Sequence, residues 1–218
     1  MKYLKKPIFF FLLFTSNPIF AAGGNVLFES FFGFGYGNWD QTIDTDVTGT
    51  IEGDTFNYHY GLNLQYYLAS DIAALGVAYR IGNESFSYSE DSSEDGDDSW
   101  AAKSSATSKN LGLALTLQMT GQTQLKLVYF FSSSLEHDDH FIDTFGVVEY
   151  EGKGFSITLQ RSLLKSLMWT ISFKSMSYAD ASIDGESVTL PGAFSDGTLG
   201  ELSNKSLEFG LALPIRFL

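Results

Sequence analysis

Cysteine is absent from this chain of 218 residues. Disulfide bonds are therefore excluded, and so is a lipoprotein anchor, which needs a thiol to carry the lipid. Basic residues are scarce, with 13 against 26 acidic ones and a net charge of −13. Because phosphate backbones are bound by basic surfaces, nucleic acid is not expected as a partner.

Long apolar runs are also missing after the N-terminus. No later stretch approaches the about 20 residues that a membrane-spanning helix needs, and the mean hydropathy is only +0.01. Such values are typical of a soluble protein. They are equally typical of a membrane β-barrel, because half of the residues in a barrel strand are polar.

The N-terminus has the order of a secretory signal peptide. Lys2, Lys5 and Lys6 precede an apolar run over 8–14, and small residues follow at 21–24. The run is too short to span a bilayer as an anchor. We therefore predict a cleaved signal peptide over 1–21 and one mature domain over 22–218, with cleavage one residue later as an alternative.

The last twelve residues carry the strongest structural signal. Six apolar side chains alternate with glycine, alanine, proline and two opposite charges; the apolar ones are Leu207, Phe209, Leu211, Leu213, Ile215 and Phe217. Successive side chains of a strand point to opposite faces, so this period of two predicts a strand with one apolar face. The small and charged opposite face suits a narrow polar barrel interior.

Seven further segments repeat the pattern, at about 26–36, 58–68, 73–82, 111–119, 125–132, 155–160 and 169–174. The connections between them alternate between short and long. The long ones, 38–56, 83–109, 133–151 and 178–205, contain 23 of the 26 acidic residues. Bacterial barrels have short periplasmic turns and longer extracellular loops, and they keep charges off the lipid-facing strands.

These observations predict an all-β fold: an eight-stranded antiparallel up-and-down transmembrane β-barrel with short periplasmic turns and long acidic extracellular loops. The expected location is the outer membrane of a Gram-negative bacterium. The pattern resembles the small eight-stranded outer-membrane barrels typified by OmpX and the OmpA transmembrane domain. The resemblance covers the whole mature chain and rests on architecture, without a signature motif, so it implies the fold and no particular activity.

The alternation places seven titratable side chains inside the barrel: Glu29, His59, Arg80, Lys126, Lys174, Glu208 and Arg216. An eight-stranded barrel is just wide enough for side chains to fill, and buried charges must be paired. We expect a charge network in two layers. Glu29 would lie with Arg216, Lys126 or Lys174 in the lower layer, and Glu208 with Arg80 and His59 in the upper layer. Conduction of protons or ions along these charges is the alternative.

Two motifs in the long connections are weighed as chemical sites. His137-Asp138-Asp139-His140 could bind a metal or activate water, but a solvated acidic loop explains it as well. Residues 91–98 resemble the start of an EF-hand loop, yet Ala102 stands where a bidentate glutamate is required. Weak divalent-cation binding by these carboxylates is left open.

The sequence therefore predicts no catalytic residue, no cofactor and no metal site, and the protein is not expected to be an enzyme. The expected function is a structural or interaction role in the cell envelope, through a charge-filled barrel that displays acidic surface loops. A narrow pore or carrier for small solutes is the alternative, and an enzyme acting on lipid or peptide is third. The expected partners are outer-membrane lipid and lipopolysaccharide, the barrel-assembly machinery and weakly bound divalent cations at the loops.

Overall fold

A computed structural model of the chain describes residues 26–44, 48–68, 72–90, 100–137, 148–164, 166–183, 186–194 and 197–217. The predicted signal peptide at 1–21 lies outside these residues. The described part forms ten strands: β1 (Val26–Asp44), β2 (Thr48–Tyr67), β3 (Ala73–Glu90), β4 (Trp100–Thr120), β5 (Thr123–His137), β6 (Val148–Leu164), β7 (Leu167–Ile183), β8 (Glu186–Thr189), β9 (Gly192–Phe194) and β10 (Gly197–Phe217). No described helix could cross a membrane.

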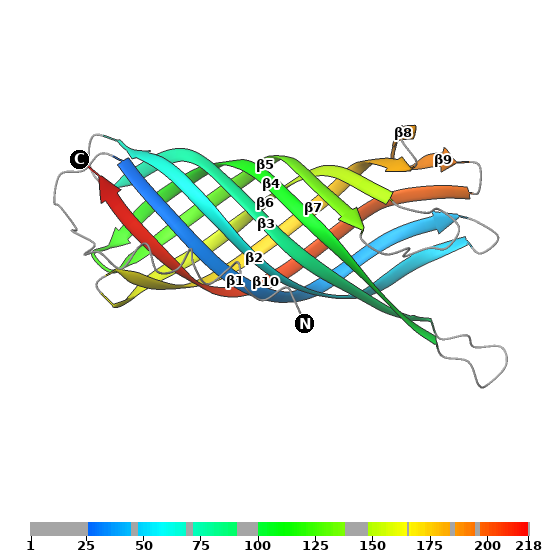
Figure 1. Cartoon of the computed structure of the whole chain (residues 1–218), viewed down its shortest axis with the longest axis horizontal. Coiled ribbons are helices and arrows are strands. Elements are labelled where there is room, and N and C mark those ends of the chain that lie inside the picture. The colour runs from blue at the N-terminus through cyan, green and yellow to red at the C-terminus, as the bar shows by residue number, and fades with distance from the viewer. Residues whose placement is uncertain are drawn as a thin grey trace, which may run out of the picture.

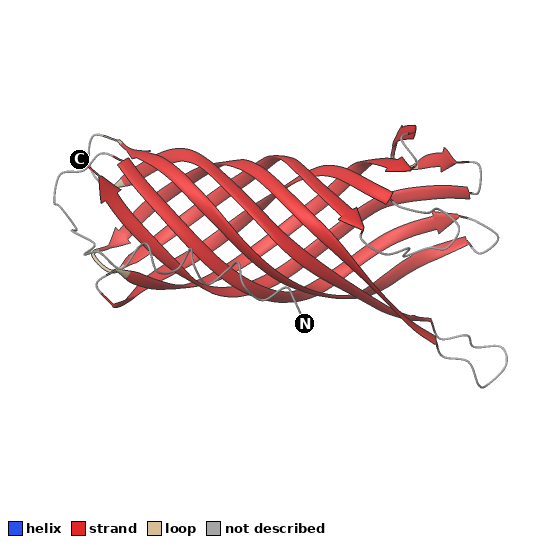
Figure 2. Cartoon of the chain, viewed as in Figure 1, coloured by secondary structure: helices blue, strands red, loops and turns tan. Residues whose placement is uncertain are grey.

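Eight of the strands close into a barrel (Figures 1 and 2). Strands β1 to β7 each pair antiparallel with the next, β10 pairs with β7, and β1 pairs with β10 from Val26 opposite Phe217 to Gln41 opposite Leu202. The short strands β8 and β9 only extend the edges of β7 and β10. The predicted all-β, eight-stranded, antiparallel, up-and-down barrel is therefore confirmed.

The barrel has two different ends. The start of β1, the end of β10 and the short hairpin connections gather at one end, here called the turn end, where the C-terminus lies in Figure 1. The other end, here called the outer end, carries the long connections. Short turns are periplasmic in bacterial barrels, so the turn end faces the periplasm.

The predicted lengths of the strands and loops were wrong. Strand β1 continues to Asp44 rather than ending near residue 36, and β10 begins at Gly197 rather than near residue 207. Most described residues of the predicted long loops belong to strands that run on past the membrane. The reason is that the alternation continues in these stretches with the polarity of its two faces exchanged.

A belt of apolar side chains surrounds the part of the barrel nearest the turn end. It includes Phe32, Phe34, Leu62, Leu64, Leu75, Val77, Leu113, Ile157, Leu159, Phe209 and Leu211, each exposed over more than two fifths of its surface. Aromatic residues, among them Tyr36, Tyr58, Tyr79 and Phe155, stand at its outer edge. In water such a surface would be a strong liability, whereas a bilayer covers it.

Above this belt the outward face becomes polar and the inward face apolar. Exposed residues there include Asn38, Asp40, Asp54, Glu136, Glu149, Glu151 and Asp180. Buried residues of the same strands include Trp39, Phe86, Leu135, Tyr150, Met176, Tyr178 and Leu199, which belong to one apolar cluster. This upper part, here called the extension, is organised as a soluble protein, with a dry core and a charged surface.

Glycines in the wall make room for the charged side chains inside. A Cβ atom at Gly33 would lie 2.8 Å from the ring of His59, and one at Gly35 would lie 2.8 Å from Cγ of Glu208. Only a residue without a side chain lets these two long side chains lie across the narrow lumen. The small inward residues of β1 thus position the charged site.

Candidate functional site

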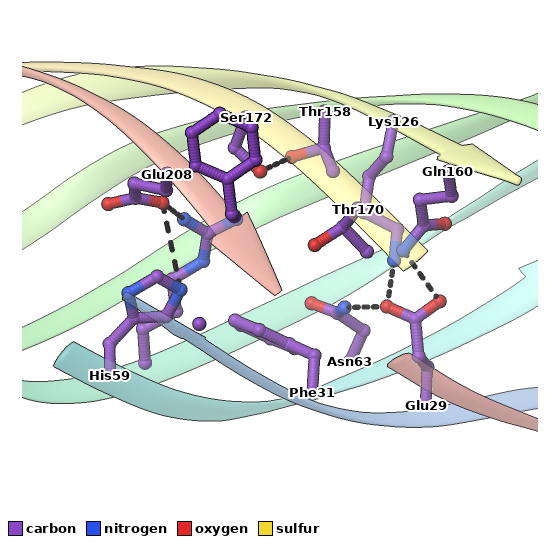
Figure 3. A pocket seen from close by; sticks show the side chains of 13 residues that line it. Glu29, Phe31, His59, Asn63, Lys126, Thr158, Gln160, Thr170, Ser172 and Glu208 are labelled. Atoms are coloured by element: carbon purple, nitrogen blue, oxygen red, sulfur yellow. Dashed lines mark hydrogen bonds and ion pairs between the residues drawn. The ribbon is translucent and has the colours of Figure 1, made fainter. Parts of the chain in front are cut away.

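The lumen holds a lower cluster of buried polar side chains around Glu29 of β1 (Figure 3). Lys126 of β5 donates a hydrogen bond to Oε1 of Glu29 and forms an ion pair with it. Asn63 donates to Oε1 at 2.8 Å, and Gln160 donates to Oε2 at 3.2 Å. The Glu29 carboxylate is completely buried and receives bonds from three other strands.

An upper cluster is centred on Glu208 of β10, which is 1% exposed. The Glu208 carboxylate lies 3.5 Å from Nη1 of Arg80, 3.6 Å from Nε2 of His59 and 3.8 Å from Nζ of Lys174. The same lysine lies 2.8 Å from the Glu84 carboxylate. Glu84 also accepts a hydrogen bond from Asn204 at 2.5 Å.

Arg80 connects several walls of the barrel. Its Nη2 donates to Ser156 Oγ at 3.0 Å. Its guanidinium carbon lies 4.8 Å from the ring centre of Phe31 and 5.1 Å from that of Phe130. A cation this close to two aromatic faces is stabilised by both ring quadrupoles, more so where water is excluded.

Glu84 is a buried carboxylate that the sequence analysis missed, because it assigned residues 83–109 to a loop. The alternation itself carries the signal: Arg80, Gly82 and Glu84 follow one another on the inward face of β3. Continuing the period of two for two more residues would have placed Glu84 inside. With it, the two clusters together contain three carboxylates (Glu29, Glu84 and Glu208) and three permanent cations (Arg80, Lys126 and Lys174), so they are neutral together when His59 is uncharged.

Of the three cations expected as alternatives beside Glu29, the structure brings Lys126 of β5 to it. Arg216 lies opposite Leu27 in the β1–β10 register, and its guanidinium carbon is 3.6 Å from the ring centre of Tyr67. Lys174 belongs to the upper cluster and not the lower one. Lys174 lies seven residues beyond the start of β7 at the turn end, as Arg80 does on β3. Glu29 and Lys126 each lie three residues beyond the start of their strands.

A small cavity separates the two clusters and is lined by residues of both, including Glu29, Asn63, Gln160, His59 and Glu208 (Figure 3). It offers about 10 Å³ to the centre of a water-sized sphere, room for about one water molecule. Buried atoms Nδ1 of His59, Oδ1 of Asn63 and Oε1 of Gln160 have no hydrogen-bond partner among the described residues. A trapped water suits such a polar space.

The interior of the extension holds a second polar group of side chains. Ser104 Oγ lies 2.9 Å from Nδ1 of His137, whose ring lies 5.4 Å from that of Phe86 and 5.7 Å from that of Tyr150. The Tyr150 hydroxyl is hydrogen-bonded to Gln41 at 3.1 Å. Burial above the lipid belt raises the pKa of Tyr150 to about 12.

The candidate motifs of the long connections are only partly described. His137 is 6% exposed at the end of β5 and faces the inside of the extension. Residues 138–140 and the acidic stretch 91–98 lie outside the described residues. Within the described part of the chain, no group of three or more His, Cys, Asp or Glu side chains could hold a metal ion.

Comparisons with known proteins show similarity at the level of fold. No family model and no curated protein matches the sequence. Similar solved structures include the outer membrane protein OprG from Pseudomonas aeruginosa, with 12% identity, a TM-score of 0.48 and coverage of 89% of this chain and 97% of that chain. Neisserial surface protein A has 8% identity, a TM-score of 0.45 and coverage of 88% and 97%. The outer membrane protease OmpT from Escherichia coli has 12% identity, a TM-score of 0.42 and coverage of 88% and 97%.

At these identities and scores the likenesses say nothing about activity, and the fold rests on the chain's own geometry. Strand order, antiparallel pairing and closure are all present. The apolar belt covers the outside of the wall, and paired charges fill the inside. By these features the chain has the architecture of the small eight-stranded outer-membrane β-barrels, as the sequence predicts.

Proposed function

We propose that the protein is an outer-membrane barrel with a closed lumen, which holds a rigid, acid-surfaced extension outside the membrane for structural or adhesive contacts. Two ion pairs that cross the lumen carry the proposal. Around the ring of eight strands, Glu29 of β1 and Lys126 of β5 come from opposite walls, and so do Glu84 of β3 and Lys174 of β7. A barrel crossed along two different diameters leaves no continuous channel.

The extension supports the same proposal. Its interior is filled by the apolar cluster around Trp39, Phe86 and Tyr150, so the barrel is packed above the charged clusters as well. Its outer surface carries Asp40, Asp54 and other exposed carboxylates. Loops mounted on such a packed base would be held at a fixed distance above the membrane. That arrangement suits recognition or spacing better than transport.

Planar-bilayer conductance tests the closed lumen. The folded wild-type barrel should give no conductance steps. Two variants each remove one crossing pair, Glu29→Ala with Lys126→Ala and Glu84→Ala with Lys174→Ala. Both should also give no conductance, because the other pair and the apolar core of the extension still close the barrel. Folding of each is checked by its heat-modifiable mobility on gels. Regular conductance steps from the folded wild-type protein would contradict the proposal.

A narrow pore is a second candidate, favoured by the water-sized cavity and the unsatisfied polar atoms of His59, Asn63 and Gln160 around it. Such a lumen could pass protons along side chains and water without passing hydrated ions. Vesicles loaded with a pH-sensitive dye distinguish the two functions. Proton entry that depends on the barrel and is lost in His59→Phe would favour the pore.

An enzymatic role has the least support. His137 packs against Phe86 and Tyr150 inside the extension rather than at a surface open to a substrate. The proposed location is the outer membrane of a Gram-negative bacterium. The implied partners are the barrel-assembly machinery, the lipids of that membrane and divalent cations at the acidic surface.

A further inference from the structure

Exposed basic side chains are rare on this acidic barrel, and most of those described stand at one level. The described exposed ones are Lys109 of β4, Lys153 of β6, Lys205 of β10 and Arg161 of β6. Arg161 lies near the turn end. The other three, here called the lysine row, lie on every second strand along one half of the ring, which runs β4, β5, β6, β7, β10.

Each member of the lysine row occupies the next outward-facing position above the apolar belt. Going towards the outer end, Lys109 is the next outward-facing residue beyond Leu111, Lys153 the next beyond Phe155, and Lys205 the next beyond Leu207. These three apolar residues are 40%, 43% and 47% exposed. The lysines therefore begin where the lipid-facing surface ends.

The three lysines also lie at one height above the turn end. Lys109 lies eleven residues before the end of β4 at Thr120, Lys153 eleven before the end of β6 at Leu164, and Lys205 twelve before the end of β10 at Phe217. With a rise of about 3.3 Å per residue and a tilt of about 40°, eleven residues climb about 28 Å. The apolar band of such barrels is about 25 Å tall, so the lysine row lies at the outer headgroups.

The opposite side of the barrel differs at this level. The position above Tyr36 on β1 is Asn38, and the position above Phe56 on β2 is Asp54. On the side of the lysine row, the intervening strands carry serines, with Ser134 opposite Lys109 and Ser175 opposite Lys205. Neighbouring members of the row are two strand spacings apart, about 10 Å.

The carboxylates nearby do not account for the row. The only described ion pair in it joins Lys109 Nζ to Glu136 Oε2 at 3.7 Å, with both side chains 50% exposed, and such pairs contribute little. No ion pair joins Lys153 or Lys205 to a described carboxylate. Glu151 and Glu201 lie further out on the same strands. Anions are thus attracted at the level of the row and repelled above it.

We propose that the lysine row binds the phosphate groups of a phosphorylated glycolipid in the outer leaflet, the lipid A portion of lipopolysaccharide. The inference rests on the proposed outer-membrane location, and it adds a lipid-binding side to the barrel. Two phosphate groups on one headgroup can contact two lysines of the row, while its acyl chains cover the belt around Leu111 and Phe155. The binding is electrostatic and is weakened by salt.

Native mass spectrometry of the full-length mature barrel in phosphatidylcholine nanodiscs containing diphosphorylated lipid A tests the proposal. The wild-type barrel should retain bound lipid A. The variant K109Q/K153Q/K205Q should bind it about fivefold more weakly for each lysine removed. The variant K109R/K153R/K205R should bind as the wild type does, and R161Q, which removes an exposed cation near the turn end, should leave binding unchanged.

Two further lipids identify the recognised group. Dephosphorylated lipid A should bind equally to the wild type and to K109Q/K153Q/K205Q. Phosphatidylglycerol should bind to the wild type more weakly than diphosphorylated lipid A does. Undiminished binding of lipid A by the glutamine variant would overturn the proposal, as would equal retention of phosphatidylglycerol. The lysine row lies on the outside of the wall, so these variants should not change the conductance of the barrel. A conducting lumen would overturn the proposed function but would leave the lipid-binding result unchanged.

Discussion

The membrane-spanning part of the barrel and the extension above it are built from the same eight strands, but the polarity of their inner and outer faces is opposite. In the lower part Phe32 and Leu64 face outward while Glu29 and Lys126 are buried. In the upper part Asp40 and Glu149 face outward while Trp39 and Tyr150 are buried. The solvent outside the wall decides which face is apolar, so the height at which the faces exchange marks the edge of the bilayer.

The largest expected effect comes from breaking the lower cluster. Glu29→Gln leaves the Lys126 ammonium buried without its carboxylate, which should lower the free energy of unfolding by about 3–5 kcal/mol. Urea unfolding from lipid vesicles measures it. Glu29→Gln combined with Lys126→Met should recover much of the loss, because no unpaired charge is left. Strictly additive effects would show that the two side chains do not interact.

A core substitution in the extension should cost somewhat less. Phe86 is 2% exposed, and its ring centre lies 5.7 Å from that of Trp39. Phe86→Ala should lower the free energy of unfolding by about 3 kcal/mol, the low end for such changes, because the ends of β3 and β4 can adjust. Protease added outside the vesicles should then cut the extension faster. The exposed neighbour Ser85→Ala is the control, and equal cutting of both variants would contradict a packed core.

The two regions should respond differently to one substitution on the outward face. Leu115→Arg, on the lipid-facing side of β4, should cost about 2–4 kcal/mol because it places a charge in the hydrocarbon. Thr42→Arg, exposed on β1 in the extension, should change the free energy of unfolding by no more than about 0.5 kcal/mol. Unfolding from vesicles compares them directly. Comparable losses at both positions would mean that the boundary between the regions is misplaced.

The smallest effect is expected for the surface pair of Lys109 and Glu136. Both side chains are half exposed and 3.7 Å apart, so a double-mutant cycle should give a coupling of about 0.2–1 kcal/mol. Raising the salt concentration should remove most of it. A coupling that is larger and insensitive to salt would show that the pair is shielded from water, and that the bilayer reaches further up the wall.

The sequence by itself determined the fold class and the facing of individual residues. A strand has a period of two, so the pattern from Leu207 to Phe217 assigns every side chain of that stretch to one face without knowledge of its neighbours. The same rule pointed Glu29, Arg80 and Glu208 inward. It would also have placed Glu84 inside, had the alternation been followed past the point where the apolar residues change face.

Only the tertiary structure decided which buried charges meet. Glu29 lies beside the lysine of β5 rather than Arg216 of the adjacent strand β10, because the closure of the ring brings opposite walls within reach of long side chains. Lys174 lies 2.8 Å from Glu84 and 3.8 Å from Glu208, at the level of Arg80 rather than of Glu29. The outer limits of the strands were decided in the same way. A strand of alternating serine and phenylalanine is stable above the membrane only when seven others enclose its apolar face, and this enclosure is a property of the closed barrel rather than of any one segment.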